Sequence, residues 1–174
     1  AAELRTLLAL QGQEQPKEDL HDWNARNVYR SLLTREEAKK RIFAWLYNPA
    51  SRDFLSNRAY KRDEIINKYY DGHYVNTIFG RKIQSDSYHA LNYIIQSTTS
   101  DILLRQMIKI HKALNNKKTS ISFSMHDSLV LDFSLDDKEI FKELAEQFSA
   151  TELGKFKTNI SIGKTFGNME QIQI

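Results

Sequence analysis

The spacing of the apolar residues changes from the helical period to period two between residues 115 and 120 of this 174-residue chain, and that change limits what the chain can fold into. Between residues 86 and 115, apolar side chains recur close to the helical period, which predicts one long helix. In the later stretch TSISFSMHDSLVLDFS, apolar and polar residues alternate on both sides of a short polar turn. The apolar residues are Ile121, Phe123 and Met125 before the turn and Leu129, Leu131 and Phe133 after it. Two runs of period two around a turn predict a β-hairpin with Asp127 at its tip.

The remaining segments complete a mixed fold. We expect helices over residues 1–10, 34–47, 51–71 and 136–148, a polar loop over 11–23, a turn with a short extended piece over 72–83, and a final strand over 155–163. Thr34 and Glu37 form a capping-box pattern at the start of the second helix, and Pro49 should end it. The order of elements predicts an α+β fold, whose antiparallel sheet combines the hairpin with the C-terminal strand.

The composition excludes several classes of protein. Hydrophobic residues make up 41% and charged residues 27%, as in ordinary globular proteins of one domain or two small ones. Without cysteine there is no disulfide, no cysteine-bound zinc and no thiol nucleophile, which fits a reducing compartment. No apolar run approaches the ~20 residues that cross a bilayer, and the start does not resemble a signal peptide, so no membrane partner is expected. An excess of 25 basic over 22 acidic residues permits a polyanionic partner.

Arg35, Lys39, Phe43 and Tyr47 lie four positions apart in the expected 34–47 helix. Four residues advance about 40° around a helix, so these side chains form one slowly winding stripe, with cations first and aromatic rings beyond. A helix N-terminus with added cations suits a phosphate chain, and the rings could stack on a sugar or a base. The alternative is a surface helix whose cations point to water while its aromatic residues and Leu46 lie in the core.

His126 and Asp127, at the expected hairpin tip, form a second candidate site. A carboxylate held at a tight turn beside a histidine suits a metal ion, but two-metal phosphoryl transfer needs a second converging carboxylate. Asp132 lies in the same hairpin but is displaced along the strand. The alternative is that Asp127 only forms the turn, where aspartate is favoured.

Asn92 and Gln96 form a third candidate pair, on one face of the expected long helix in an otherwise apolar segment. Each amide offers a donor and an acceptor, which suits the acceptors that every base pair shows in the minor groove. The alternative is a pair of buried amides that bond to the backbone.

Taken together, these segments resemble the family A DNA polymerases, the group of bacterial DNA polymerase I and the replicases of short-tailed phages. AELRTLLAL is similar to the end of motif A, EDLH to the Asp-Ile/Leu-His that precedes the fingers, and REEAKKRIFAWLY to motif B, with its pattern Arg-x3-Lys-x3-Phe-x3-Tyr. GRK at 80–82 stands where the family has Gly-Arg-Arg, ALNYIIQSTTSDI resembles the phage form of the Asn-x3-Gln helix, and SMHDSLVLD resembles motif C. The motifs follow one another in the family's order.

The resemblance implies a nucleotide site. Arg35 and Lys39 would hold the triphosphate of an incoming dNTP, and Lys39 would be a candidate proton donor to the leaving pyrophosphate. Phe43 would pack on the nucleotide sugar, and Tyr47 would close the pocket against the template base. Glu3 would be the steric gate that excludes a ribose 2′-OH, and it would bond to Tyr47.

The resemblance also implies a DNA site and a metal site. Asn92 and Gln96 would read the minor groove near the primer end, with Arg81 as a further DNA contact and His126, in the catalytic centre, at the primer terminus. Asp127 would bind the catalytic Mg²⁺ ions. The partners would be primer–template DNA and dNTPs. The reaction would be attack of the primer 3′-oxygen on the α-phosphate, promoted by positioning and metal electrostatics.

The resemblance assigns residues 1–12 to the palm, 13–83 to the fingers with the motif B helix, and 84–174 to the palm with the motif C hairpin. The chain would then be the C-terminal palm-and-fingers part, without thumb and exonuclease, of a phage or bacterial polymerase. Such an enzyme would act in the cytoplasm of a bacterium or of a phage-infected host. The sequence identifies no processivity partner.

Two departures from the family pattern support a rival hypothesis. Family spacing puts the first catalytic aspartate shortly before Ala1, and Ser128 replaces the glutamate that usually follows Asp127. We therefore do not expect the chain as written to polymerise alone. The rival is a non-catalytic descendant that binds nucleic acid or scaffolds a replisome. A small-molecule phosphotransferase is a more distant alternative, against which stands the lack of a glycine-rich phosphate loop.

Overall fold

The computed structural model describes residues 2–172 and forms two compact units, Ala1–Asp101 and Ile102–Ile174. The boundary falls inside a long helix, after Asp101. Helices and short antiparallel strand pairs make up both units, which confirms the expected α+β class. No helix within residues 2–172 is long and apolar enough to cross a membrane.

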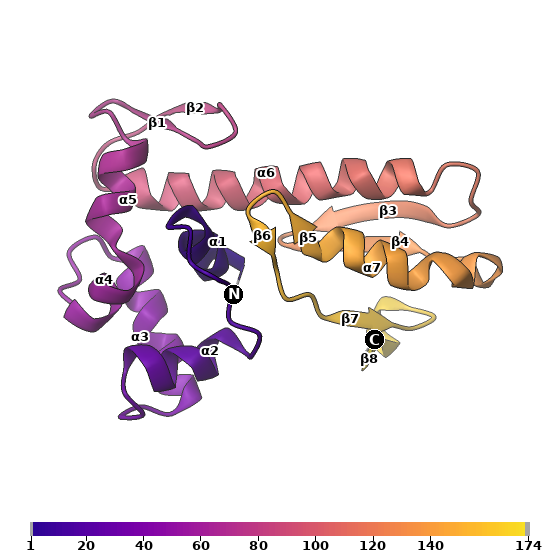
Figure 1. Cartoon of the computed structure of the whole chain (residues 1–174), viewed down its shortest axis with the longest axis horizontal. Helices are drawn as coiled ribbons and strands as arrows, with labels where there is room; N and C mark the ends of the chain where they lie inside the picture. The colour runs from indigo at the N-terminus through magenta and orange to yellow at the C-terminus, as the bar shows by residue number, and fades with distance from the viewer. Residues whose placement is uncertain (1, 173–174) are drawn as a thin grey trace. The chain divides into compact units, whose positions relative to one another are not determined.

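The first unit is mostly helical (Figure 1). Its elements are α1 (Ala2–Leu10), α2 (Leu20–Trp23), the π-helical turn η1 (Asn24–Val28), α3 (Arg35–Tyr47), α4 (Phe54–Tyr60), α5 (Arg62–Tyr69), β1 (Tyr74–Asn76), β2 (Lys82–Gln84) and the first half of α6 (Ala90–Ala113). β1 and β2 form a small antiparallel hairpin, so the expected extended piece is in fact a strand pair.

The second unit contains the end of α6 and the remaining strands. Its other elements are β3 (Ser120–Met125), β4 (Ser128–Asp132), the 3₁₀ turn η2 (Leu135–Ile140), α7 (Phe141–Ser149), β5 (Ala150–Thr151), β6 (Gly154–Lys155), β7 (Ile160–Ile162), the 3₁₀ turn η3 (Phe166–Asn168) and β8 (Glu170–Ile172). Its core consists of Ile110 and Leu114 from α6 and Leu144 from α7, with half-buried residues of the β3–β4 hairpin packed against them.

Helix α1 lies inside the first unit rather than on its surface. Its apolar core residues are fully buried: Leu4, Leu7 and Leu8. Arg5 is also buried, and its guanidinium donates to backbone carbonyls of the following loop at 2.9 and 3.0 Å. Thr6 shares a 2.9 Å hydrogen bond with Thr99 of α6. Burial of each leucine contributes roughly 1.5–3 kcal/mol, so packing rather than intrinsic propensity holds this nine-residue helix.

The limits of α3 are those that its sequence predicts. The Thr34 backbone N–H donates to the Glu37 carboxylate at 2.8 Å, and the Glu37 N–H donates to the Thr34 hydroxyl at 3.3 Å. This capping box satisfies two N–H groups that no helical carbonyl can reach. At the other end Asn48 is extended and Pro49 follows, so the helix stops at Tyr47.

Two segments of the first unit differ from expectation. The expected loop over 11–23 ends early, because Asp19 caps α2 by accepting the N–H groups of His21 and Asp22. The expected single helix over 51–71 is two helices, α4 and α5, separated at Lys61. Lys61 has a φ of 45°, a left-handed conformation that interrupts a helix.

The β3–β4 hairpin confirms the expected turn, with His126 and Asp127 between the strands. A bulge lies between Ile121 and Phe123, so that Ile121 pairs with Leu131 but Phe123 pairs with Val130. Cross-strand partners share a face, and one extra residue reverses that face. Phe123 therefore does not join Ile121 in the core; it is 45% exposed and stacks on Phe166 at 5.8 Å.

The expected sheet of the hairpin plus a C-terminal strand is wrong. Within residues 2–172 the strands form two-stranded pairs, and β7 pairs with β8 rather than with the hairpin. The expected strand over 155–163 contributes only the end of β6 and the whole of β7. The last described strand, β8, lies beyond the elements that the sequence predicts.

The capping box gives a direct test of how α3 is held. We expect Thr34→Ala to lower the free energy of unfolding by about 0.5–2 kcal/mol, because the Glu37 backbone N–H loses the hydroxyl that accepts its hydrogen bond. Urea denaturation followed by circular dichroism measures this loss. Thr34→Ser keeps the hydroxyl and should lose much less, and equal losses in both variants would contradict the capping role.

Candidate nucleotide and nucleic-acid site

The stripe on α3 faces solvent while the opposite face of the helix is in the core. The buried side chains of α3 are Ala38, Ile42, Trp45 and Leu46. Arg35 and Lys39 are exposed, Phe43 is half-buried and Tyr47 is 47% exposed. The alternative that puts both rings in the core with Leu46 is therefore wrong for Tyr47. The stripe is accessible to a ligand along its whole length.

Tyr47 joins α3 to the first turn of α1. Its hydroxyl donates to Glu3 Oε2 at 2.6 Å, across 44 positions of sequence. Its ring stacks almost parallel on Phe43, with 6.0 Å between centroids and 10° between planes. Partial burial and the hydrogen bond to the Glu3 carboxylate raise the pKa of Tyr47, so the phenol stays protonated and keeps donating. The structure thus contains the Glu3–Tyr47 contact that the resemblance implies.

His21 belongs to the same cluster, although it was not among the candidate site residues. The residue is 5% exposed, and the centroid of its ring lies 5.6 Å from that of the Phe43 ring. Within residues 2–172 its Nδ1 atom has no hydrogen-bond partner. Burial lowers the pKa of His21 and favours the neutral ring, although Asp19 opposes this shift. The segment EDLH was the available signal for it.

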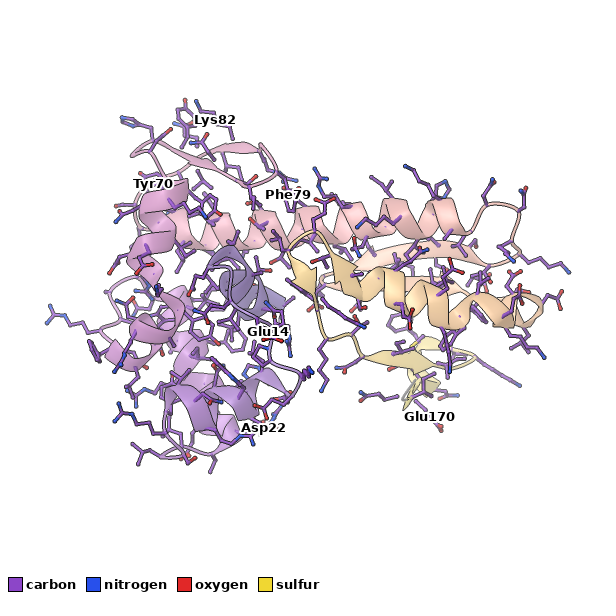
Figure 2. All side chains as sticks on the ribbon, in the orientation of Figure 1. Glu14, Asp22, Tyr70, Phe79, Lys82 and Glu170 are labelled. Carbon is purple, nitrogen blue, oxygen red and sulfur yellow. The ribbon has the colours of Figure 1, made fainter. Side chains whose placement is uncertain are left out.

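Arg35 is held by carboxylates of the α2 segment. Its Nε and Nη2 atoms donate to Asp19 at 3.1 and 3.2 Å, and Asp22, labelled in Figure 2, lies 3.9 Å from Nε. Burial alone would raise the pKa of Asp19, but hydrogen bonds from Arg35 and from two backbone N–H groups lower it to about 2. Lys39 forms no hydrogen bond or ion pair with any described residue, so its ammonium group is available to an anion.

The amide pair on α6 is also accessible. Asn92 is half-buried and Gln96 is exposed. Among the described residues, neither side chain forms a hydrogen bond within the protein, which excludes the alternative of buried amides bonded to the backbone. Arg81, by contrast, already pairs with Asp101 of α6.

The hairpin tip presents His126 and Asp127 to solvent. His126 has a φ of 54°, which turns the chain between β3 and β4, and both side chains are exposed. Neither side chain bonds to another described residue. Residues 2–172 contain no group of three or more acidic or histidine side chains that could hold a metal ion. Asp127 can therefore supply one ligand, but these residues do not make a complete metal site.

Comparison with known proteins identifies the family. A model of DNA polymerase family A matches residues 52–168, which include the amide pair and the hairpin tip. The chain belongs to the family A DNA polymerases. The helix α3 and Glu3 lie before the matched residues.

Two curated relatives, both named DNA polymerase I, are similar to this polymerase chain. The protein of Caldicellulosiruptor bescii is 27% identical in an alignment 172 residues long. The alignment covers 74% of this chain and 20% of the relative. The protein of Borreliella burgdorferi is 27% identical in an alignment 157 residues long. This alignment covers 79% of this chain and 16% of the relative. The chain spans at most about a fifth of the length of these relatives.

The ion pair at Asp19 predicts a pH dependence. Because the pKa of Asp19 falls from 3.8 to about 2 on folding, its contribution to stability is present above pH 3.8 and is lost as the pH falls towards 2. Carboxyl ¹³C NMR should give a midpoint near 2 for Asp19, and Arg35→Met should raise that midpoint. An unchanged midpoint in Arg35→Met would show that Arg35 does not lower the pKa.

Proposed function

We propose that this chain is part of a template-directed DNA polymerase that adds dNTPs to a primer 3′-OH. The observation that carries the proposal is the exposed face of α3. There the cations Arg35 and Lys39 are followed along the helix by the stacked rings of Phe43 and Tyr47, and Tyr47 donates a hydrogen bond to Glu3. Membership of the polymerase family supports the reaction class. The activity belongs to the longer protein, whose relatives extend well beyond the part that this chain matches.

The face of α3 binds the incoming nucleotide in this proposal. Lys39, which has no anionic partner in the described residues, holds the triphosphate and donates a proton to the leaving pyrophosphate. Arg35 joins it when Asp19 releases part of the guanidinium. Phe43 supports the sugar, Tyr47 lies against the template base, and Glu3 excludes a 2′-OH. The work of these residues is to orient the triphosphate, which is the main protein contribution to phosphoryl transfer.

The second set of residues binds DNA. The accessible amides of Asn92 and Gln96 read minor-groove acceptors near the primer end. His126 contacts the primer terminus, and Arg81 reaches DNA after leaving Asp101. The partners are therefore primer–template DNA and dNTPs.

Asp127 is proposed as one ligand of the catalytic Mg²⁺ ions. Bound Mg²⁺ would neutralise charge on the phosphates and activate the primer 3′-oxygen. The described residues contain no group of three or more possible ligands, and in this proposal motif A of the longer polymerase supplies the second carboxylate.

We further propose the subdomains that the resemblance implies. Residues 1–12 and 84–174 are the palm, residues 13–83 are the fingers, and the thumb and any exonuclease precede this part. The enzyme serves replication in a bacterium or in a phage-infected host. The source and the cytoplasmic location rest on the resemblance and on the bacterial relatives.

Two features of the hairpin tip and its surroundings favour a second candidate function, binding of nucleic acid without catalysis. Ser128 stands beside Asp127, and the described residues contain no group of three or more acidic or histidine side chains that could hold a metal ion. A non-catalytic descendant that binds nucleic acid or scaffolds a replisome needs no such group. It would retain DNA binding that weakens steeply with salt, but it would not extend a primer.

The role of Lys39 is tested by substitution in a longer protein restored upstream through motif A and the thumb. Lys39→Ala should slow single-nucleotide primer extension by roughly 10²–10⁴-fold, the range for loss of a proton-transfer group. Lys40→Ala, an exposed neighbour on another face of α3, is the control and should change the rate less than threefold. Similar rates for the two variants would remove Lys39 from the triphosphate site.

The role of Glu3 is tested by sugar selection in the same protein. Glu3→Ala should raise ribonucleotide incorporation relative to deoxyribonucleotide incorporation, because no side chain then opposes the 2′-OH. Glu14→Ala, on the exposed loop labelled in Figure 2, should leave the ratio unchanged. Competition assays with matched dNTP and rNTP measure it, and an unaltered ratio in Glu3→Ala would exclude the steric gate.

A further inference from the structure

Arg62 holds the C-terminal end of α3 from outside that helix. It is the first residue of α5 and only 6% exposed. Its guanidinium donates to three backbone carbonyls: Nη1 to Pro49 at 3.0 Å, and Nη2 to Asn48 at 3.4 Å and to Trp45. These carbonyls lie on both sides of Tyr47 in the chain.

The contacts of Arg62 are those of a cation at the negative end of a helix dipole. The last carbonyls of a helix have no helical N–H partner, and a guanidinium can serve several of them at once. The Arg62 guanidinium also lies over the Trp45 ring, 4.5 Å from its centroid. In residues 2–172 Arg62 forms no ion pair; carbonyl oxygens and this ring contact its buried guanidinium, and the Asp63 carboxylate attracts it only from a distance.

Termination of α3 does not require Arg62. Pro49 already prevents continuation, and the Asn48 N–H already closes on Ala44 O at 3.2 Å. What Arg62 adds is a fixed path for the chain on either side of Tyr47, whose side chain points away to Glu3. A residue that only ended the helix would not need to donate hydrogen bonds to backbone carbonyls both before and after Tyr47.

We propose that Arg62 is a positioning residue that holds Tyr47, and through it Glu3, in the arrangement that selects deoxyribonucleotides. This inference rests on the proposed function, because it names a further specificity determinant of the same site. Loss of the guanidinium frees the last turn of α3. Tyr47 then leaves Glu3, and the Glu3 carboxylate is no longer held against the position of the 2′-OH.

The enzymatic test compares Arg62→Met and Arg62→Lys with Arg58→Met in the longer polymerase. Discrimination between dNTP and rNTP should fall on the order of tenfold in Arg62→Met, the size of coupling found between neighbouring residues. Arg62→Lys, which keeps the charge but loses the fork of donors, should fall less. Arg58 is exposed on α4, and Arg58→Met should not change discrimination. A discrimination ratio does not depend on the amount of folded enzyme, so unchanged ratios in both Arg62 variants would overturn the inference.

A second measurement on this chain separates the inference from the proposed function. In the chain labelled with [¹³Cζ]-tyrosine, the Tyr47 resonance, assigned with Tyr47→Phe, reports its hydrogen bond to Glu3. Arg62→Lys should move this resonance towards that of a Glu3→Ala chain, in which Tyr47 has lost its acceptor, while Arg58→Met should leave it in place. If the longer protein does not extend a primer, the proposed function fails and this spectrum alone decides the inference. A Tyr47 resonance that stays unchanged in folded Arg62→Lys would overturn it.

Discussion

The position of Glu3 depends on the burial of α1 in the first unit. A nine-residue helix is too short to persist alone in water, so its leucines and the buried Arg5 must be enclosed by the surrounding loop and helices. Enclosure leaves the first turn of α1 beside the end of α3. Glu3 is therefore placed by the packing of the residues that follow it, and it meets Tyr47 across 44 positions of sequence.

Helix α3 connects this core to the candidate nucleotide site. One face supplies Ile42, Trp45 and Leu46 to the interior, and the other presents Arg35, Lys39 and Tyr47 to solvent. Its two ends are fixed by different means, a capping box at Thr34 and the guanidinium of Arg62 at the C-terminus. Because both ends are anchored, the exposed stripe is a defined surface and not merely a solvated face of a mobile helix.

Local signals explain what could be predicted from the sequence. The capping residues Thr34 and Glu37 predict the start of α3, and the alternation around His126 and Asp127 predicts the hairpin, because each depends on neighbouring residues. The bulge after Ile121 and the break at Lys61 depend on single backbone conformations that many residue types can adopt. The pairing of β7 with β8 depends on distant segments, so the pattern within one strand could not reveal it.

In the candidate site, too, the sequence predicts the features that depend on neighbouring residues but not those that depend on distant ones. The four-residue spacing identifies the stripe, but it does not decide whether Tyr47 or its neighbour Leu46 faces the core. That choice involves α1, a distant segment of the sequence, whose Glu3 carboxylate accepts the hydrogen bond of the Tyr47 hydroxyl. The sequence does not single out His21, because its place in the cluster comes from its contact with Phe43, which no local pattern contains.

Primer extension by the protein restored upstream through motif A and the thumb tests the central claim most directly. The wild-type protein and Asp127→Asn are compared with Asp132→Asn, the exposed aspartate displaced along the same hairpin. A polymerase with Asp127 as metal ligand should extend the primer in the wild type and in Asp132→Asn but not in Asp127→Asn. A wild-type protein that binds the primed template without extending it would contradict the claim, as would equal extension by the Asp127→Asn variant.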